Sequence, residues 1–116
     1  MQKFTKKQIL RLPEEISQVL KHRQKTSQHL ILYKTSGETP VSRLGLAIPK
    51  KNAKRAVDRN RIKRIIRETF RQSSYKNPKD IVVKLSTPIG KKTRRRLREA
   101  ERLQIRQQVK VLIQDE

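Results

Sequence analysis

The sequence predicts an α+β fold, a two-layer α/β sandwich in which helices pack on a small sheet. Three short segments, residues 29–34, 41–49 and 81–85, have the alternation or the β-branched content of strands. Two long segments, residues 53–72 and 91–113, carry apolar residues at helical spacing. With a short helix before them, the predicted order is α-β-β-α-β-α. A chain of 116 residues can bury one modest core, so residues 1–116 are predicted to form a single domain.

The N-terminal part is predicted to be an arm followed by a short helix. Residues 1–12 are basic and weakly patterned, which predicts a mobile basic arm. A helix at residues 13–21 begins with a proline followed by Glu14 and Glu15. Proline fits the first turn of a helix, and acidic side chains are stabilised near the positive end of its dipole. The polar residues 21–28 then predict a loop.

The first two strands are predicted to be joined by a hairpin turn at residues 35–40, which contains a glycine and a proline. In the first strand Leu30 and Leu32 share one face, and Tyr33 shares the other face with His29 and Ile31. The second strand alternates between large and small residues: Leu44, Leu46 and Ile48 against Gly45 and Ala47.

The helix predicted at residues 53–72 has an apolar side and a cationic side. Residues 50–71 contain ten Lys or Arg and only two acidic residues. Like charges four residues apart repel each other, so a helix that accepts this cost is expected to have an anionic partner. The alternative, a merely solubilising face, fits the one-sided charge less well. The outward side carries Asn60, Arg64, Arg67 and Arg71, and Lys63 lies at its edge.

The composition favours a nucleic-acid partner. The formal net charge is +21 and the pI is about 11.4, and a polyanion would relieve the resulting self-repulsion. A membrane partner is disfavoured, because no apolar run approaches the ~20 residues of a spanning helix. The absence of cysteine excludes disulfide scaffolds and thiolate metal sites. The N-terminus does not have the pattern of a secretory signal, so a cytoplasmic location is expected.

The sequence contains no self-contained catalytic site. The acidic residues are scattered, and His22 and His29 stand without a supporting cysteine or acidic motif for a metal. Three glycines in the chain do not form a phosphate-binding loop. Tyr33 allows two interpretations, because its ring could stack on an unpaired base or be a half-buried strand residue. The pattern alone leaves both open.

Residues 43–71, RLGLAIPKKNAKRAVDRNRIKRIIRETFR, closely resemble the protein component of bacterial ribonuclease P. The hallmark of that family is an Arg-Asn-Arg sequence, here residues 59–61, after a strand that ends in two lysines, here Lys50 and Lys51. The similarity continues in Leu32-Tyr33 and in the strand that begins with Asp80-Ile81-Val82, and covers about residues 9–113.

The resemblance implies that the chain is the small subunit of a ribonucleoprotein endonuclease. In that family a large RNA subunit uses Mg²⁺ to hydrolyse one phosphodiester of precursor tRNA, which removes the 5′ leader. The protein binds the catalytic RNA, with one protein per RNA expected, and holds the single-stranded leader in a cleft between its sheet and its helices. The family fold has a left-handed β-α-β crossover, whereas such connections are right-handed as a rule.

The resemblance also implies two groups of binding residues. Contacts to the catalytic RNA are expected from Lys50, Lys51, Arg55, Arg59, Arg61, Arg64 and Arg71. Leader contacts are expected from Tyr33, Asn60, Lys63 and Arg67, and from Ile16 and Leu20, which stand where the family usually has aromatic residues.

Besides Ile16 and Leu20, two departures limit the resemblance. The link at residues 52–55 lacks the glycine that is usual in the family and is one residue longer, and Pro49 stands where a serine commonly precedes the paired lysines. The resemblance also assigns no role to the basic residues at 91–98. Basic composition alone would equally fit a ribosomal or architectural nucleic-acid-binding protein without a role in cleavage. The Arg-Asn-Arg context favours the ribonuclease P subunit.

Overall fold

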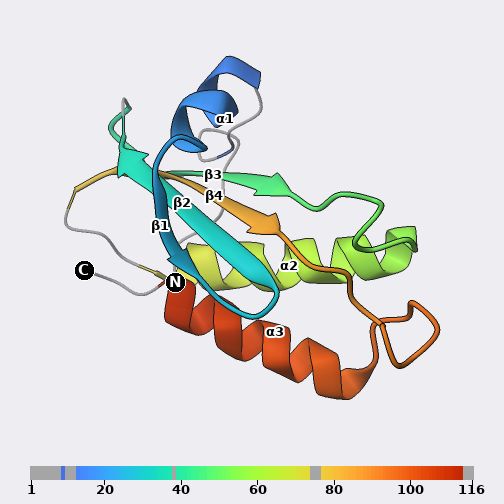
Figure 1. The fold of residues 1–116 in the computed structure, drawn as a ribbon. Coiled ribbons are helices and arrows are strands. Elements are labelled where there is room, and N and C mark those ends of the chain that lie inside the picture. The colour runs from blue at the N-terminus through green and yellow to red at the C-terminus, as the bar shows by residue number, and fades with distance from the viewer. Residues whose placement is uncertain (1–8, 10–12, 38, 74–76, 114–116) are drawn as a thin grey trace.

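The computed structural model describes residues 9, 13–37, 39–73 and 77–113. The chain forms an α+β fold, as predicted, with a four-stranded sheet and three helices (Figure 1). The predicted basic arm, residues 1–12, lies outside the described residues except for Ile9, which forms a parallel bridge with Leu44. The elements in chain order are α1 (Pro13–Val19), β1 (Arg23–Thr26), β2 (Leu30–Ser36), β3 (Arg43–Ala47), α2 (Ala56–Gln72), β4 (Lys79–Leu85) and α3 (Glu99–Leu112).

The strand order in the sheet is β1-β2-β4-β3. β4 pairs antiparallel with β2, with Val82 opposite Tyr33, and parallel with β3, with Ile81 opposite Leu44. The prediction of a hairpin between β2 and β3 is therefore wrong, because β4 lies between these two strands. The physical reason is that the side chains of β4 are buried on both faces, which suits the centre of a sheet. Gly37, in the predicted turn, donates instead to the carbonyl of Pro78 at 2.9 Å, just before β4 begins.

The strand β1 was not predicted, and the observed order is α-β-β-β-α-β-α. Residues 21–28 contain no apolar alternation, so the sequence predicts a loop there. β1 forms an antiparallel edge pair with β2, and the side chains of Lys25 and Thr26 are exposed there. An edge strand with solvent on its outer side can be polar along its whole length, so hydrophobic periodicity does not reveal it.

The two long helices begin later than predicted. α2 begins at Ala56 instead of residue 53, and α3 begins at Glu99 instead of residue 91. Gly90, Arg94 and Arg95 have φ values of 67°, 53° and 66°, which are incompatible with a right-handed helix. Residues 90–98 therefore form a compact loop before α3, here called the basic loop.

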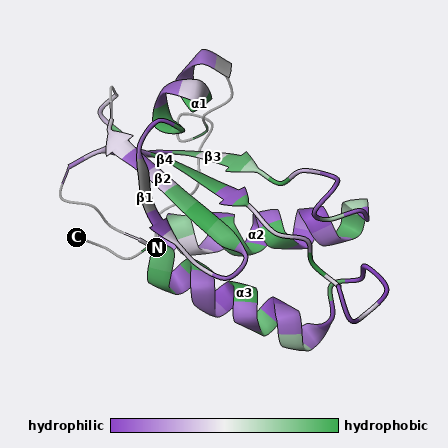
Figure 2. Cartoon of the chain, viewed as in Figure 1, coloured by the Kyte–Doolittle hydropathy of each residue, from purple (hydrophilic) through white to green (hydrophobic). Residues whose placement is uncertain are grey.

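The main core lies between one face of the sheet and the helices α2 and α3 (Figure 2). The isoleucines and the phenylalanine of α2 point into it, as their spacing predicted, and α3 contributes Ile105, Val109 and Leu112. The helix α1 covers part of the opposite face, where Val19 packs with Tyr33 and Val82. Each fully buried aliphatic side chain stabilises the fold by about 1.5–3 kcal/mol. The buried apolar side of α2 therefore fixes the orientation of this helix against the sheet.

The helix α2 connects two adjacent parallel strands, β3 and β4. The connection runs under the sheet with a left-handed turn (Figure 1), as the family resemblance implied. Because the apolar side of α2 faces the sheet, its cationic side faces away from the protein.

A buried arginine connects α1 to the sheet. Arg43, on β3, donates two hydrogen bonds to Asp80 on β4, at 3.0 Å and 2.8 Å, and a further one to Glu15 on α1. The hydrogen bond to Asp80 is the largest of the interactions that raise the pKa of Arg43 above its ordinary value, with Glu15 adding to it and burial opposing both. The guanidinium therefore stays charged, and its two carboxylate partners keep α1 in place.

Candidate nucleic-acid interface

The outward face of α2 forms a shallow hollow of about 490 Å³. Arg64 and Arg67 are exposed beside it, and the half-buried Arg71 lies one turn further along. Arginine presents a planar fork of N–H donors that fits phosphate oxygens, so this face suits an anionic ligand. The structure thus brings together residues that the sequence predicted to share the cationic side, with one acidic neighbour; the lining residues are Asn60, Arg64, Arg67, Glu68 and Arg71.

Two further predicted contacts on α2 differ from each other. The side chain of Arg61 is exposed. Arg59 is half-buried, and its Nη1 donates to the carbonyls of Ala53 at 2.8 Å and Lys54 at 3.0 Å. Arg59 therefore holds the turn that precedes α2, a role that the sequence did not reveal. Since one of its nitrogens serves these two carbonyls, the rest of the guanidinium remains for a ligand.

The turn before α2 presents more cations, and none of its residues 50–55 has the positive φ that would favour glycine. Lys50, Lys51, Lys54 and Arg55 are all exposed. Asn52 is buried, donates from Nδ2 to the carbonyl of Leu85 at 2.8 Å, and accepts from the N–H of Ile89 at 2.8 Å through its own carbonyl. The asparagine thus joins the turn to the end of β4, and the exposed lysines around it are held in place by these bonds.

The structure does not place all the predicted leader residues together. Ile16 and Tyr33 belong to the smaller apolar cluster under α1, on the face of the sheet opposite to α2. Tyr33 is only 7% exposed, which favours the interpretation as a packed strand tyrosine over a freely stacking ring. Leu20 is 37% exposed beside that cluster. Asn60, Lys63 and Arg67 lie on α2, and only the first and last of these line the hollow. The leader roles of these residues stay predictions.

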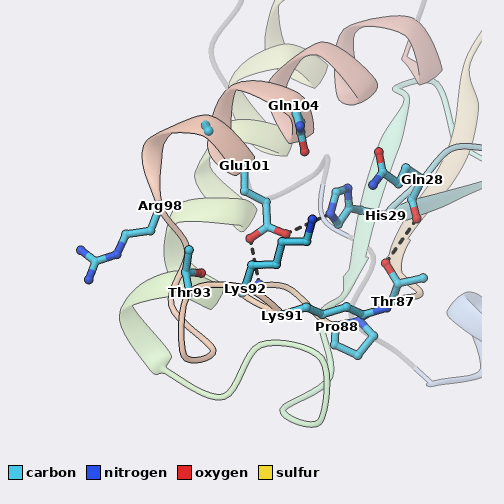
Figure 3. Close-up of a pocket in the computed structure, with 12 residues that line it drawn as sticks. Gln28, His29, Thr87, Pro88, Lys91, Lys92, Thr93, Arg98, Glu101 and Gln104 are labelled. Carbon is cyan, nitrogen blue, oxygen red and sulfur yellow. Dashed lines mark hydrogen bonds and ion pairs between the residues drawn. The ribbon is translucent and has the colours of Figure 1, made fainter.

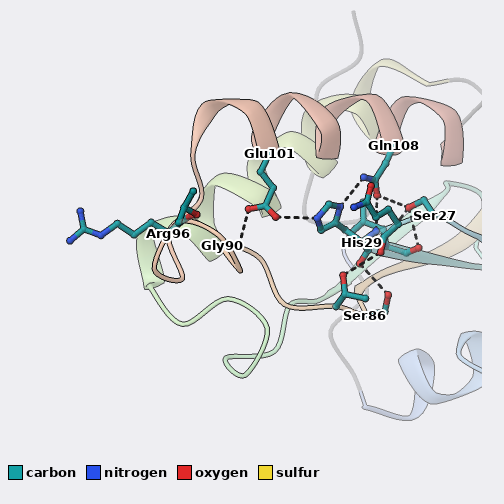
Figure 4. A network of polar contacts seen from close by, with 11 residues as sticks. Ser27, His29, Ser86, Gly90, Arg96, Glu101 and Gln108 are labelled. Carbon is teal, nitrogen blue, oxygen red and sulfur yellow. Dashed lines mark hydrogen bonds and ion pairs between the residues drawn. The ribbon is translucent and has the colours of Figure 1, made fainter.

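His29 differs from its predicted position, because it turns towards α3 and not to the face of Tyr33. It is 4% exposed, and its Nε2 lies 3.2 Å from Oε2 of Glu101 (Figure 4). Its Nδ1 lies 2.8 Å from Nε2 of Gln108. His29 precedes the first residue of β2, so the direction of its side chain does not follow the alternation of a strand, which the prediction assumed. Within the described part of the chain, His, Asp and Glu side chains form no group of three that could hold a metal ion.

A cavity of about 410 Å³ lies next to His29, between the basic loop, the start of β2 and the first turn of α3 (Figure 3). Lys91, Lys92 and Arg98 line it together with the carboxylate of Glu101. The run of basic residues at 91–98 is visible in the sequence, but the cavity beside it is not. The signals that could have revealed it are Gly90, which precedes that run, and Leu97, the one apolar residue within it.

Comparison with known proteins identifies the family. The family model for ribonuclease P matches residues 4–104. This chain belongs to the ribonuclease P protein family. The ribonuclease P protein component of Thioalkalivibrio sulfidiphilus is 45% identical over 86 residues, which are 71% of this chain and 70% of that protein. The ribonuclease P protein component of Aliivibrio fischeri is 40% identical over 82 residues, which are 69% of this chain and 70% of that protein.

Solved structures of ribonuclease P proteins have the same fold. The Staphylococcus aureus RNase P protein superposes with a TM-score of 0.70 and 26% identity, covering 90% of this chain and 91% of that chain. The Thermotoga maritima protein superposes with a TM-score of 0.67 at 23% identity, covering 90% and 93% of the two chains, and this likeness shows the fold alone. Family membership makes the chain a protein component of ribonuclease P, and so a protein of tRNA processing. In the described residues no helix is long and apolar enough to cross a membrane.

Proposed function

We propose that this chain binds the RNA subunit of ribonuclease P and assists Mg²⁺-dependent removal of the 5′ leader from precursor tRNA. The observation that carries the proposal is the hollow on α2, where Asn60 and three arginines face outward from a helix whose other side is buried. A cationic face fixed on a rigid helix can neutralise RNA phosphates without first ordering its own backbone.

The catalytic-RNA side of the proposal includes both α2 and the turn before it. Exposed cations run from the turn onto the helix, and the turn is held by bonds from Arg59 and Asn52. This fixed geometry supports one continuous contact with a phosphate backbone. The residues assigned to it are Lys50, Lys51, Arg55, Arg59, Arg61, Arg64 and Arg71.

The leader side of the proposal rests on fewer groups. Asn60, Lys63 and Arg67 would contact the leader backbone from α2. Ile16 would offer apolar contact from α1, and so would the exposed Leu20, which directly follows that helix. Tyr33 is kept in this group on the family resemblance, with its hydroxyl rather than its packed ring as the group that could reach RNA.

The chemistry of cleavage is assigned to the RNA. Mg²⁺ prefers hard oxygen ligands and commonly binds nucleic-acid phosphates, so we place the ion mainly on the RNA subunit. In that assembly, with one protein per RNA and a cytoplasmic location, this chain reduces phosphate repulsion and holds the substrate. The residues of this chain position RNA and perform no bond cleavage.

The decisive experiment mixes the protein with a bacterial ribonuclease P RNA and a precursor tRNA at low Mg²⁺. We expect no cleavage by the protein alone and stimulated cleavage by the RNA when the protein is added. The test variant replaces Arg64, Arg67 and Arg71 by Gln, which removes charge from the hollow without disturbing the apolar face, and it should stimulate cleavage less than the wild type. Binding of RNA without stimulation would instead support a purely architectural role.

A further inference from the structure

The basic loop carries a dense group of cations that the proposed function does not use. Residues 90–98 contain six Lys or Arg, and all six side chains are exposed: Lys91, Lys92, Arg94, Arg95, Arg96 and Arg98. The sequence from residue 86 to residue 98 contains no acidic residue. Such a group repels itself in the free protein, and an anionic ligand would relieve that repulsion.

The loop has a fixed, closed shape. The carbonyl of Gly90 accepts from the N–H of Arg95 at 2.7 Å and from that of Thr93 at 3.1 Å, and Thr93 Oγ1 donates to the carbonyl of Arg96 at 2.6 Å. A Cβ on Gly90 would come within 2.5 Å of the backbone at Arg95, so the loop closes tightly on that glycine. Two successive arginines, Arg94 and Arg95, are in the left-handed region, where glycine or asparagine would be more favourable.

Both ends of the loop are anchored in the fold. At its first residue, Gly90 donates its N–H to Glu101 Oε1 at 2.8 Å, and the other oxygen of that carboxylate contacts His29 (Figure 4). Near its last residue, the buried Leu97 donates its N–H to Oδ2 of Asp58 at 3.2 Å. The cations therefore stand on a backbone that is already ordered, and binding would require little further ordering.

The loop is concave on one side and lies beside the proposed RNA contact. A hollow of about 420 Å³ is lined by Lys92, Thr93, Arg94, Arg96 and Arg98. The hydrogen bonds from Leu97 to Asp58 and from Ile89 to Asn52 place the loop against the start of α2. The exposed cations of the loop and those of the turn before α2 thus meet at one end of the protein.

The chemistry of the loop selects a particular kind of RNA. Single-stranded RNA is usually held by stacking its bases on aromatic rings in addition to phosphate contacts. Residues 86–98 contain no aromatic residue, whereas arginine and lysine contact phosphates of any sequence. The loop is therefore suited to the backbone of a base-paired segment and not to the single-stranded leader.

We propose that the basic loop is a second binding surface for ribonuclease P RNA, which contacts the phosphate backbone of a base-paired segment next to the one bound by α2. The inference rests on the proposed function and extends it by naming a further set of contact residues. It assigns a role to the basic segment 91–98 that the family resemblance leaves without one.

The first experiment measures the affinity of the full-length protein for ribonuclease P RNA, without tRNA, as a function of salt. The test variant is Arg94→Gln/Arg95→Gln/Arg96→Gln, and the matched control Lys25→Gln/Arg106→Gln/Lys110→Gln removes the same charge from exposed positions elsewhere. We expect the test variant to bind about tenfold more weakly at 0.15 M salt, with a salt slope reduced by about two, since each phosphate contact contributes about 0.7–0.9. The control should change both quantities much less, and equal losses in the two variants would overturn the proposal.

A second variant separates binding from folding. Arg94→Asn/Arg95→Gly places residues that tolerate left-handed conformations at these two positions, so the loop should keep its shape and the protein its stability. It should still bind more weakly, by about fivefold, and backbone footprinting should lose protection in a base-paired segment. Wild-type affinity and an unchanged footprint would overturn the proposal, even with a fully folded protein.

Two controls separate this proposal from its alternatives. If the loop contacts the catalytic RNA, the ratio of holoenzyme affinities for precursor and mature tRNA stays as in the wild type, and a changed ratio would mean that the loop binds the leader. If the wild-type chain neither binds the RNA nor stimulates cleavage, the proposed function itself fails. If the wild-type chain binds the RNA and stimulates cleavage, and the loop variants do so equally well, the proposed function stands and the loop assignment fails.

Discussion

The buried carboxylate of Asp58, in the first turn of α2, accepts a hydrogen bond from the backbone N–H of Leu97 at 3.2 Å. The two residues are 39 positions apart in the sequence. This bond fixes the end of the basic loop against the start of the basic helix. It also explains an acidic residue in a highly cationic stretch, because Asp58 is 1% exposed and faces inward.

Asp58→Ala is expected to lower the free energy of unfolding by about 1–3 kcal/mol, because it leaves the Leu97 N–H without its acceptor and removes a favourable charge from the helix N-terminus. Denaturant unfolding measures the loss, and hydrogen exchange of the Leu97 amide locates it. Asp58→Asn, which retains an acceptor oxygen, should cost less. Unchanged protection of the Leu97 amide in Asp58→Ala would contradict the role of this bond.

Asp80→Ala is expected to destabilise the fold by about 3 kcal/mol or more, because it leaves the buried charge of Arg43 with only Glu15 as a partner. Asp80 is the largest cause of the raised pKa of Arg43, but an arginine keeps its charge in proteins even without such a partner, so the variant cannot relieve the loss by deprotonation. Thermal or denaturant unfolding measures the effect. The double variant Arg43→Met/Asp80→Ala should lose less than the sum of Arg43→Met and Asp80→Ala, and strict additivity would argue against coupling.

Arg59→Ala and Arg64→Ala should separate folding from RNA binding. Arg59 supports the turn before α2 through the carbonyls of Ala53 and Lys54, so its loss should cost about 1 kcal/mol of stability as well as RNA affinity. Arg64 is exposed, and its loss should reduce only the affinity and the salt slope, the latter by about one. Unfolding and RNA-binding titrations on the same samples test this pairing. A salt slope that stays at the wild-type value in Arg64→Ala would show that this side chain faces solvent in the complex.

Leu20→Phe is expected to strengthen binding of precursor tRNA by about threefold without changing the binding of mature tRNA, because an exposed ring directly after α1 could stack on a leader base. Tyr33→Leu is the companion variant, since it keeps an apolar side chain in the cluster under α1 but removes the hydroxyl. If Tyr33 contacts the leader, only precursor binding should weaken. Equal weakening for both RNAs would assign Tyr33 a purely structural role.

The sequence by itself determined the fold class, the two faces of α2 and the family. These features depend on local order: periodicity places Ile62, Ile65, Ile66 and Phe70 on one side of a helix whatever it packs against, and all four are buried. The Arg-Asn-Arg sequence after the paired lysines is equally local. The outward residues Asn60, Arg64, Arg67 and Arg71 were predicted to share a face for the same reason, and they do.

Only the tertiary structure decided what depends on contacts between distant segments. The place of β4 between β2 and β3 arises because a strand buried on both faces gains most at the centre of the sheet. The burial of Tyr33 depends on α1 covering its side of the sheet. The compact basic loop depends on Glu101 and Asp58, whose carboxylates bind its two ends. Sequence periodicity reports which residues seek burial, but the partner that buries or binds each of them is fixed only when the whole chain packs.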